Sequence, residues 1–485
     1  MLFSSPESRS AQRSSAVHCA LIVFGVLAFG LKAWTCFCLF PVNAWNDVRL
    51  RPSFLIADGL PLYPGLKEGV ITTWIYGPAH PLLFLPVTLF RDIQSVYLAA
   101  GAGNVLQFVF ALTFTCWLWP CASSIPRKMN RSILAVLAGL LMVPNVFLTI
   151  AQADNTSLVF GLLSLTCLVR DEVEPSPVYL WGAAFFGVGA AFAKLHGASV
   201  IAGELLWVAL FFGPKRAVKL LVATLGCALV WSLVTLSLAP SPRAVWEHVV
   251  LLPSKLPWAS DLHGKLAAYA PYLILMVLLP GVIILAAYRL RLISRQAWLP
   301  ILVWSFSLPL GVLGALKQFG SINSLHGVFF LLPWFLIVLP TAPALPRPHL
   351  FRWGGALVFL VLGLLPITAA FSHLPRAPYL LRAQQAEQMA ASRPQSAWLP
   401  WRPLANYLAS GKNYHDEDGL FIRQVTGLYP SRNHAYAALP AQWAMTAIEI
   451  PGMVWGVARS MQPEEGTEKV WGAWELYSFR PSETD

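Results

Sequence analysis

The chain has 485 residues, of which 56% are hydrophobic and only 12% are charged. Ordinary soluble domains carry about 25% charged residues, so this composition excludes a soluble globular protein and indicates a polytopic membrane protein. The net charge of +11 does not indicate nucleic-acid binding, because the basic residues form short clusters between apolar runs and not one basic face.

The first apolar run starts at Val17, after a polar segment that contains Arg9 and Arg13. Its length of about 24 residues exceeds the core of a signal peptide, so it predicts a retained membrane span. Lys32 lies inside this run, and we expect its side chain to snorkel toward the membrane surface.

Apolar runs bounded by charge or proline predict about eleven spans in all. They lie near residues 17–40, 95–119, 132–150, 155–169, 178–194, 198–213, 217–239, 267–288, 297–316, 325–341 and 353–373. A cytoplasmic N-terminus places the short connections rich in Lys and Arg on the cytoplasmic side, as the positive-inside rule requires. This orientation holds only if residues 76–90, which contain three prolines, do not make a full crossing.

Three longer segments then share the outer side: residues 41–94, 240–266 and 374–485. The chain turns polar from Ser372 onward, which predicts a transmembrane domain at residues 1–373 and an extracytoplasmic domain at residues 374–485. Residues 377–392 are compatible with a helix and residues 469–481 resemble a strand. The expected fold class is therefore an all-α polytopic membrane protein with a small α+β extracytoplasmic C-terminal domain.

Asp47 is the first candidate for a catalytic group. It lies a few residues beyond the first span, where an acid can stay ionised and face a lipid-borne substrate. The alternative is structural: Asp47 pairs with Arg49 or Arg51, or caps a following helix. The residues alone leave these two interpretations open.

Several short motifs follow one another along the chain. Their residues are, in order, Asp47, Gly59, Tyr63, Tyr76, Pro78, Pro81, Gln152, Asn155 and Lys194. This ordered set, over roughly residues 17–340, resembles the GT-C glycosyltransferases, in particular the type that uses polyprenol-phosphate-mannose. Two positions depart from the family pattern: Leu50 and Arg51 stand where a tyrosine is usual, and Gly77 precedes Pro78 in place of a second proline.

The resemblance implies an enzyme that transfers a sugar, such as mannose, from a polyprenyl phosphate to a glycan, lipid or protein acceptor at the outer membrane face. This chemistry needs a carboxylate to take the proton of the acceptor hydroxyl, and cations to stabilise the departing lipid phosphate. Asp47 is then the expected base, Lys194 and Lys317 the phosphate-binding cations, and Gln152 and Asn155 the groups that orient hydroxyls. The other side chains expected at the substrate are Tyr63, Tyr76, Asp154, His196, Asn323 and His326.

Some of these residues also have structural interpretations. Lys194 lies near a predicted helix end and can snorkel to the interface. Lys317 lies at the end of a predicted span, where an unpaired lysine is common. Asp154 precedes a helix start that contains Thr and Ser, and capping of that helix is slightly favoured over a place in the site.

The run "YHDEDGLFIRQ" at residues 414–424 places His415, Asp416, Glu417 and Asp418 side by side. These acids do not alternate as in a calcium-binding loop, so the run predicts a solvated turn without a metal. Neither a G-x-G-x-x-G element after a strand nor a G-x-x-x-x-G-K-[ST] element occurs, which agrees with a lipid-linked donor and no nucleotide cofactor.

The main competing hypothesis is a transporter or lipid flippase without transfer chemistry. Such proteins tend to have inverted repeats and paired broken helices near the membrane midplane, and neither is evident in this sequence. Movement of substrate across vesicles without a new glycosidic product would distinguish that class from a transferase.

Overall fold

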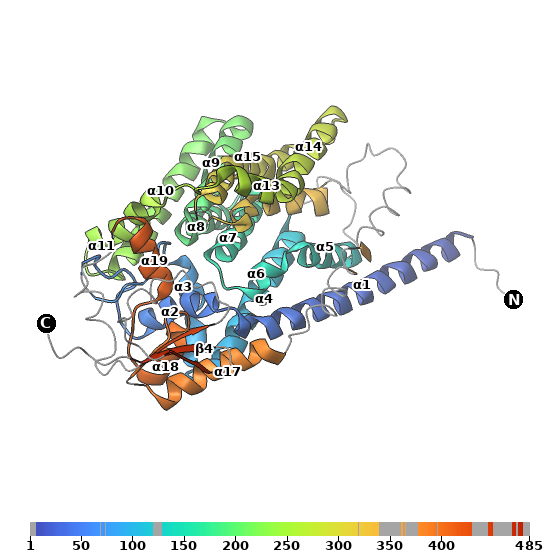
Figure 1. Cartoon of the computed structure of the whole chain (residues 1–485). Helices are drawn as coiled ribbons and strands as arrows, with labels where there is room; N and C mark the ends of the chain where they lie inside the picture. The colour runs from blue at the N-terminus through green and yellow to red at the C-terminus, as the bar shows by residue number, and fades with distance from the viewer. Residues whose placement is uncertain are drawn as a thin grey trace.

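The computed structural model describes residues 6–67, 69–72, 74–119, 129–318, 320–338, 360–361, 364, 377–394, 396–428, 445–449, 468–471 and 474–478. Helices make up most of these residues (Figure 1). The first half contains α1 (Pro6–Leu39), η1 (Phe40–Val42), α2 (Trp45–Ala57), α3 (Ala79–Leu83), η2 (Leu85–Leu89), α4 (Ile93–Leu118), α5 (Met129–Met142), α6 (Asn145–Thr149), α7 (Ala153–Val173), α8 (Pro177–Ala193), η3 (Leu195–Gly197), α9 (Ala198–Phe212) and α10 (Pro214–Ser237).

The chain then continues through shorter helical pieces before another long helix. These are α11 (Pro242–Trp246), η4 (Glu247–Leu251), α12 (Leu252–Lys255), α13 (Leu262–Leu273), η5 (Ile274–Leu278), α14 (Leu279–Arg289), α15 (Arg295–Leu316), η6 (Ile322–Leu331) and η7 (Trp334–Val338). Prolines lie inside or at the start of several of them, as expected where a proline removes a backbone donor.

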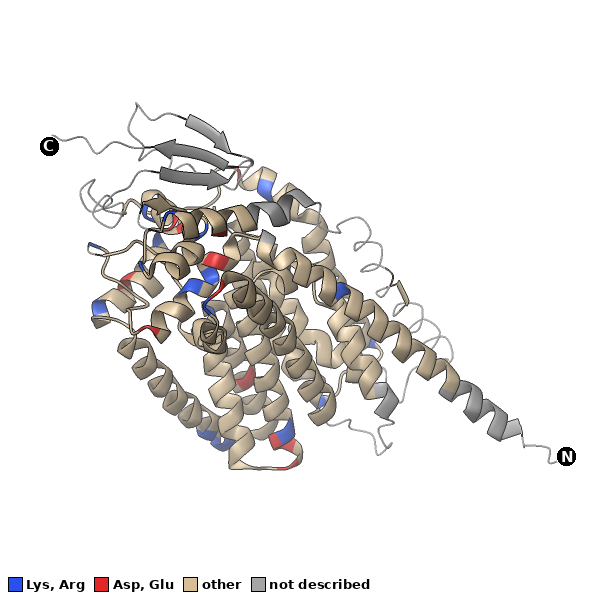
Figure 2. Ribbon diagram, turned by 90° about the horizontal axis from the view of Figure 1, so that it is seen from below, with Lys and Arg blue, Asp and Glu red and all other residues tan. Residues whose placement is uncertain are grey.

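Six of the described helical stretches are long and apolar enough to cross a membrane. They are Ala16–Leu39, Ile93–Leu118, Leu195–Phe212, Pro214–Ser237, Leu262–Arg289 and Arg295–Leu316, and each coincides with a predicted span. Figure 2 shows that charged residues gather toward the two ends of the helical bundle, whereas the helices between are nearly free of them. The protein is therefore an integral, multi-pass membrane protein; its orientation stays a prediction.

The other predicted spans are shorter or more deeply buried. Apolar helices of 10–17 residues cover Ser132–Met142, Pro177–Ala193 and Ile322–Ile337. Helix α7 is buried along nearly its whole length, as expected for a helix surrounded by others. The predicted span at residues 353–373 lies almost wholly outside the described residues, so the number of eleven stays a prediction.

Residues 76–90 form two short helical pieces and not one continuous helix. Helix α3 and the 3-10 helix η2 have five residues each. An α-helix rises about 1.5 Å per residue, so neither piece can cross a bilayer. This agrees with the prediction that the proline-rich stretch does not make a full crossing.

Lys32 does not snorkel, and that prediction is wrong. Its side chain is buried, and Nζ donates to the carbonyl oxygens of Leu140 at 3.2 Å and Leu141 at 2.8 Å, and to that of Val143. The last carbonyls of a helix have no partner within the helix. Lys32 of α1 therefore caps the C-terminal end of α5, an arrangement that helical periodicity cannot reveal.

We expect Lys32→Met to destabilise the packing of α1 on α5 by about 1–3 kcal/mol, because it leaves buried carbonyls without a donor. The thermal unfolding midpoint in detergent measures this loss. Trp34→Leu is the matched control, because Trp34 lies on the exposed side of the same helix, 62% exposed. Equal midpoints for Lys32→Met and the wild type would contradict the capping role.

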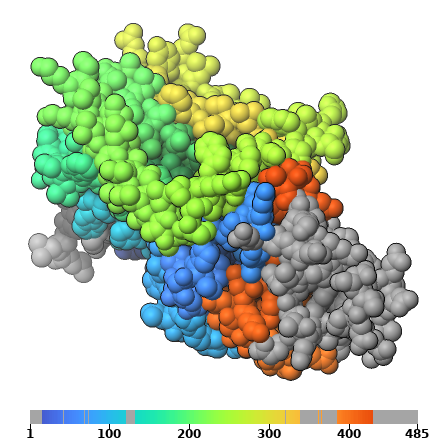
Figure 3. All heavy atoms as spheres, turned by 90° about the vertical axis from the view of Figure 1, so that its left-hand side faces the viewer, coloured from blue at the N-terminus to red at the C-terminus, as the bar shows by residue number. Residues whose placement is uncertain are grey.

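The C-terminal part contains α17 (Ala377–Ser392), β1 (Ala397–Trp398), α18 (Pro403–Ser410), α19 (Glu417–Val425), β2 (Met445–Glu449), β3 (Glu468–Trp471) and β4 (Trp474–Ser478). The helix predicted at residues 377–392 is confirmed. The strands form one sheet of order β1-β2-β4-β3, in which β1 and β2 are parallel and the other pairs antiparallel. Helix α18 packs on α2, and in Figure 3 orange residues of this part lie against the blue residues of the loop 41–94. A separate extracytoplasmic domain stays a prediction.

Candidate functional site

Two acids lie in the first turns of neighbouring helices. Asp47 is in the first turn of α2, and Asp154 is in the first turn of α7. Asn46 joins these two helix starts: its Nδ2 donates to the carbonyl of Thr149 at 2.9 Å, and its Oδ1 accepts from the backbone N–H of Ala151 at 2.8 Å. Helix N-termini favour negative charge, so both positions suit a carboxylate.

Asp47 is completely buried within a polar group made by distant parts of the chain. The Tyr97 hydroxyl donates to Asp47 Oδ1, and Arg402 Nη1 lies 3.3 Å from the same oxygen. The backbone N–H of Ala405, in the first turn of α18, contacts Oδ2 at 3.4 Å. Burial raises the pKa of the Asp47 carboxyl above its usual range, whereas Arg402 and the hydrogen bonds from Tyr97 and Ala405 oppose this rise.

The expected structural partners of Asp47 are therefore incorrect. Arg51 instead forms a buried ion pair with Asp416, and Arg49 lies 3.9 Å from Asp418. Asp47 does contact the start of a helix, but that helix is α18, far along the sequence, and not the one that follows it.

Asp154 lies at the centre of a second cluster, which we call the Asp154 group: Gln152, Asp154, Lys194, Asn323 and His326. Lys194 Nζ lies 2.5 Å from Asp154 Oδ1. Asn323 Nδ2 donates to Asp154 Oδ2 at 3.2 Å and to Gln152 Oε1 at 2.9 Å. His326 Nδ1 lies 3.3 Å from Asp154 Oδ1 and 3.0 Å from the carbonyl of Asn323. Both neighbours of this nitrogen are acceptors, so Nδ1 carries a hydrogen.

Two structural interpretations fail at this group. Asp154 does not cap α7, because Gln152 occupies the N-cap position and no side chain accepts a capping hydrogen bond there. Lys194 does not snorkel, because its side chain is only 12% exposed and pairs with Asp154. Only one of the three hydrogens of the ammonium is needed for Asp154, so Lys194 keeps donor capacity for a second anion.

Arg49 lies in α2, two residues after Asp47, and its charge interacts with Asp154. Its guanidinium lies 5.1 Å from the ring centre of Trp45 and 5.2 Å from that of Tyr76. Asp154 and Asp418 both act on its charge. Its buried Nη1 has no hydrogen-bond partner among the described residues, which leaves this cation able to donate to a ligand.

Within the part of the chain that the structure describes, two histidines close to Asp154 also keep a ring nitrogen without a partner. His80 Nδ1 lies 2.9 Å from the Thr156 hydroxyl, whereas no described residue pairs with His80 Nε2. Burial lowers the pKa of His80 to about 3, with a further contribution from Arg49, so the ring is neutral. His196 Nδ1 is likewise buried, with no partner in the described part of the chain, and the His196 ring lies 6.2 Å from that of His326.

Other predicted site residues lie outside these two clusters. Lys317 Nζ donates to the carbonyl of Leu256 at 2.7 Å and lies 4.4 Å from the ring centre of Trp258. Asn155 is fully buried, and its amide contacts Asn104 Oδ1 and the carbonyls of Phe147 and Ile150. These contacts tie the Lys317 ammonium and the Asn155 Nδ2 group to the protein itself.

The two predicted tyrosines have different surroundings. Tyr63 is fully buried, and its hydroxyl donates to the carbonyl of Tyr76 at 2.8 Å. Tyr76 is only partly buried and packs edge-on against Trp74 at 5.4 Å between ring centres. Tyr63 thus fixes the backbone that presents the Tyr76 ring to Arg49.

Gly77 explains one departure from the family pattern. A Cβ at this position would lie 1.9 Å from the carbonyl oxygen of Phe192, which is backbone and cannot move aside. Phe192 lies in the last turn of α8, two residues before Lys194. The close approach of Gly77 therefore helps to fix the position of the Lys194 backbone. Any larger residue would push these two segments apart.

If the protein transfers a sugar as the resemblance implies, we expect Gly77→Ala to lower the rate of that transfer by more than tenfold while the spans stay folded. A displacement of about 1 Å near an active site lowers a reaction rate by about 100-fold. Helical content by circular dichroism checks the fold. Gly59→Ala is not a fair control, because Gly59 has a φ of +72°. Gly65→Ala is the better one, since a Cβ there meets nothing within 4 Å. Equal activity of Gly77→Ala and Gly65→Ala would contradict this account.

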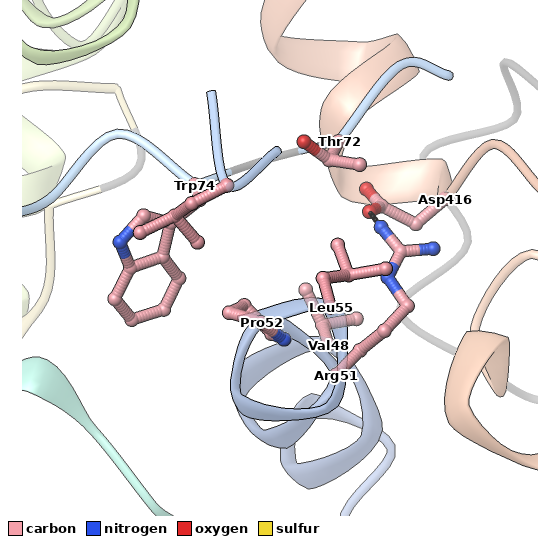
Figure 4. Close-up of a pocket in the computed structure, with 8 residues that line it drawn as sticks. Val48, Arg51, Pro52, Leu55, Thr72, Trp74 and Asp416 are labelled. Carbon is pink, nitrogen blue, oxygen red and sulfur yellow. Dashed lines mark hydrogen bonds and ion pairs between the residues drawn. The ribbon is translucent and has the colours of Figure 1, made fainter. Parts of the chain in front are cut away.

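The run at residues 414–424 is not a solvated turn, and that prediction is wrong. His415, Asp416, Glu417 and Asp418 are all buried. Asp416 caps α19 by accepting from the backbone N–H of Gly419, and it pairs with Arg51 (Figure 4). The small cavity beside this pair has a volume of about 10 Å³, room for about one water, so it cannot hold a sugar.

Metal ligands do not gather in the part of the chain that the structure describes. No three His, Cys, Asp or Glu side chains among those residues are placed to hold one ion. The Asp154 group brings its single carboxylate together with amides, an ammonium and a histidine, a set of groups that suits an organic or anionic ligand.

The fold of this chain is similar to that of solved structures of known proteins. No protein-family model matches the chain, and the search of curated proteins found no match. Two solved structures of ArnT from Cupriavidus metallidurans align over nearly the whole chain. The structure bound to undecaprenyl phosphate has a TM-score of 0.53 and 12% identity, and covers 94% of this chain and 98% of ArnT. The apo structure has a TM-score of 0.52 and 13% identity, and covers 93% and 97%. The chain is thus folded like ArnT, which confirms the GT-C fold predicted from the resemblance.

Proposed function

We propose that this protein is an integral membrane glycosyltransferase that moves a sugar from a polyprenyl phosphate to an acceptor hydroxyl at the outer membrane face. The fold likeness to ArnT, whose structure was solved with undecaprenyl phosphate, supports the lipid donor. The observation that carries the proposal is that Asn46 joins the starts of α2 and α7, so that the helix of Asp47 and Arg49 adjoins the Asp154 group. Buried ionisable groups at such depth indicate a functional site.

The reaction needs no redox step. The acceptor oxygen attacks the anomeric carbon, its proton passes to a carboxylate, and the bond from the anomeric carbon to the phosphate oxygen breaks. The electron pair of that bond leaves with the lipid phosphate. Hydrogen-bond donors and cations aimed at this developing charge supply much of the rate enhancement.

Asp47 is the proposed base. Its Oδ1 is occupied by Tyr97 and Arg402, whereas among the described residues Oδ2 has only the long contact with Ala405. Oδ2 is therefore the oxygen with capacity for the acceptor proton. A raised pKa makes the carboxylate a stronger base. Because Asp47 is 0% exposed, the chain that covers Oδ2 near Ala405 must shift before an acceptor reaches it, while Arg402 keeps its contact with Oδ1.

Lys194 and Arg49 are the proposed cations for the lipid phosphate, since each keeps donor capacity beyond its present contacts. Gln152 and Asn323 present amides that orient sugar hydroxyls, and Tyr76 forms an aromatic wall beside Arg49. Lys317 has a smaller role than the sequence predicted, because its ammonium already caps a backbone carbonyl. The sugar is a hexose such as mannose on the strength of the sequence resemblance alone.

The test is transfer of radiolabelled sugar by purified protein in nanodiscs. Synthetic polyprenyl phosphates that carry mannose, glucose or arabinose are supplied in turn, with a membrane extract as the source of acceptors. Sugar incorporated into a new product supports the proposal. Lipid carried across vesicle membranes without any new glycosidic product would overturn it and favour a flippase.

A further inference from the structure

The C-terminal segment, residues 396–428, is anchored on α2 by buried polar contacts. Arg51 pairs with Asp416, and both side chains are nearly inaccessible. The backbone of Ile71 adds two hydrogen bonds: its N–H donates to His415 Nδ1 at 2.7 Å, and its carbonyl accepts from the Asp416 N–H at 3.2 Å. These contacts keep the segment on α2, which carries Asp47, and on the loop that follows α2.

One contact of this segment reaches the proposed base directly. Arg402 precedes Pro403 at the start of α18, and its side chain is 1% exposed. Its Nη1 lies 3.0 Å from the carbonyl of Pro41, 3.2 Å from the Tyr97 hydroxyl and 3.3 Å from Asp47 Oδ1. The guanidinium is therefore fixed between the end of the first span, α4 and α2.

The direction of the hydrogen bonds follows from this geometry. Arg402 can only donate, so the Tyr97 oxygen accepts from it. The single hydrogen of the Tyr97 hydroxyl then points to Asp47 Oδ1. Arg402 and Tyr97 together occupy Asp47 Oδ1, so that Oδ2 faces the backbone of Ala405. Both contacts favour the ionised carboxylate.

We propose that Arg402 is a positioning residue for Asp47, so that the C-terminal segment is a working part of the transfer site and not an appended domain. This inference rests on the proposed function. It assigns to the segment a task that no motif predicted: it supplies the counter-ion that keeps the buried base ionised and holds its reactive oxygen in place.

Other titratable or charged groups also act on the Asp47 carboxyl and contribute to its pKa. Tyr97 approaches from α4, Arg51 acts from within α2, and Glu387 acts from α17. Burial, with a smaller contribution from Asp47, raises the pKa of Glu387 to about 7, so this side chain is largely uncharged at acidic pH. Arg402 is the cation that hydrogen-bonds Asp47, and its removal should raise the pKa of Asp47 further.

The test uses the full-length protein in nanodiscs with Arg402→Gln and Arg402→Lys. Arg423→Gln is the matched control, because Arg423 is a buried arginine of the same segment that donates to the carbonyl of Leu66 and not to Asp47. The first readout is the pH dependence of kcat/KM. The second is an infrared titration of the Asp47 carboxyl band, which is identified by its absence in the Asp47→Asn variant. This titration needs no substrate.

In Arg402→Gln, we expect the acidic limb of kcat/KM and the infrared midpoint both to move to higher pH by about 1–3 units, since a neighbouring cation shifts a carboxyl by that amount. Arg402→Lys should restore most of the shift, and Arg423→Gln should leave both curves in place. Unchanged curves in Arg402→Gln, or an equal shift in Arg423→Gln, would overturn the inference. A shifted infrared midpoint in a protein that transfers no sugar would uphold the coupling and refute the proposed function instead.

Discussion

Asp47→Asn is expected to lower sugar transfer by about 100- to 10,000-fold, the usual contribution of a positioned general base. Asparagine keeps the shape of the side chain but cannot take the acceptor proton. The measurement is single-turnover transfer from the donor lipid, which separates the chemical step from product release. Binding of the donor lipid should change little, because the proposed phosphate cations belong to other side chains.

The same substitution also leaves Arg402 as a buried charge without its carboxylate. Breaking such a pair from one side costs about 3–5 kcal/mol, so a loss of activity in Asp47→Asn alone could reflect a loss of folding. The double variant Asp47→Asn/Arg402→Gln removes both charges and should recover much of the thermal stability without recovering transfer.

Asp416→Asn supplies the matched control, because it breaks a different buried Arg–Asp pair between α2 and the C-terminal segment. We expect a comparable loss of stability with far more remaining transfer than in Asp47→Asn. Near-normal turnover in Asp47→Asn would refute the assignment of the base.

The sequence predicts the membrane-spanning helices well because apolar length is a local property. The runs near residues 17–40 and 297–316 reappear as spans with ends shifted by one or two residues. Gln152 and Lys194 belong to two of the motifs and lie in one cluster with Asp154, since Gln152 and Asp154 are at the start of α7 and Lys194 follows the end of α8.

What the sequence could not predict are contacts between distant residues. Arg402 is 355 residues from Asp47 and lies between two prolines, in a context that gives no sign of a buried ion pair. The acids at residues 416–418 looked solvated because charge runs usually are, but α2 supplies arginines that allow Asp416 to be buried. Lys32 misled for the same reason: its partners are the carbonyls at the end of another helix.

Lys194→Gln should weaken binding of undecaprenyl phosphate by about 10- to 100-fold, because a hydrogen bond to a charged group contributes about 1.5–3 kcal/mol. Binding of the sugar-free lipid to protein in nanodiscs measures this directly. Lys317→Gln is the matched control, since it also removes one lysine near a span end but one that is tied to Leu256 and Trp258. Its affinity should stay within about twofold of the wild type, well below the tenfold that 1.4 kcal/mol produces.

Lys194→Gln also leaves Asp154 buried without its ammonium, so affinity and folding must be separated. The double variant Lys194→Gln/Asp154→Asn removes the unpaired charge, and the amide of Asn323 and His326 Nδ1 remain to contact the new side chain. If Lys194 holds the phosphate, the double variant regains thermal stability but still binds the lipid weakly. If Lys194 serves only to neutralise Asp154, stability and lipid affinity recover together, and the phosphate must bind Arg49 without its help.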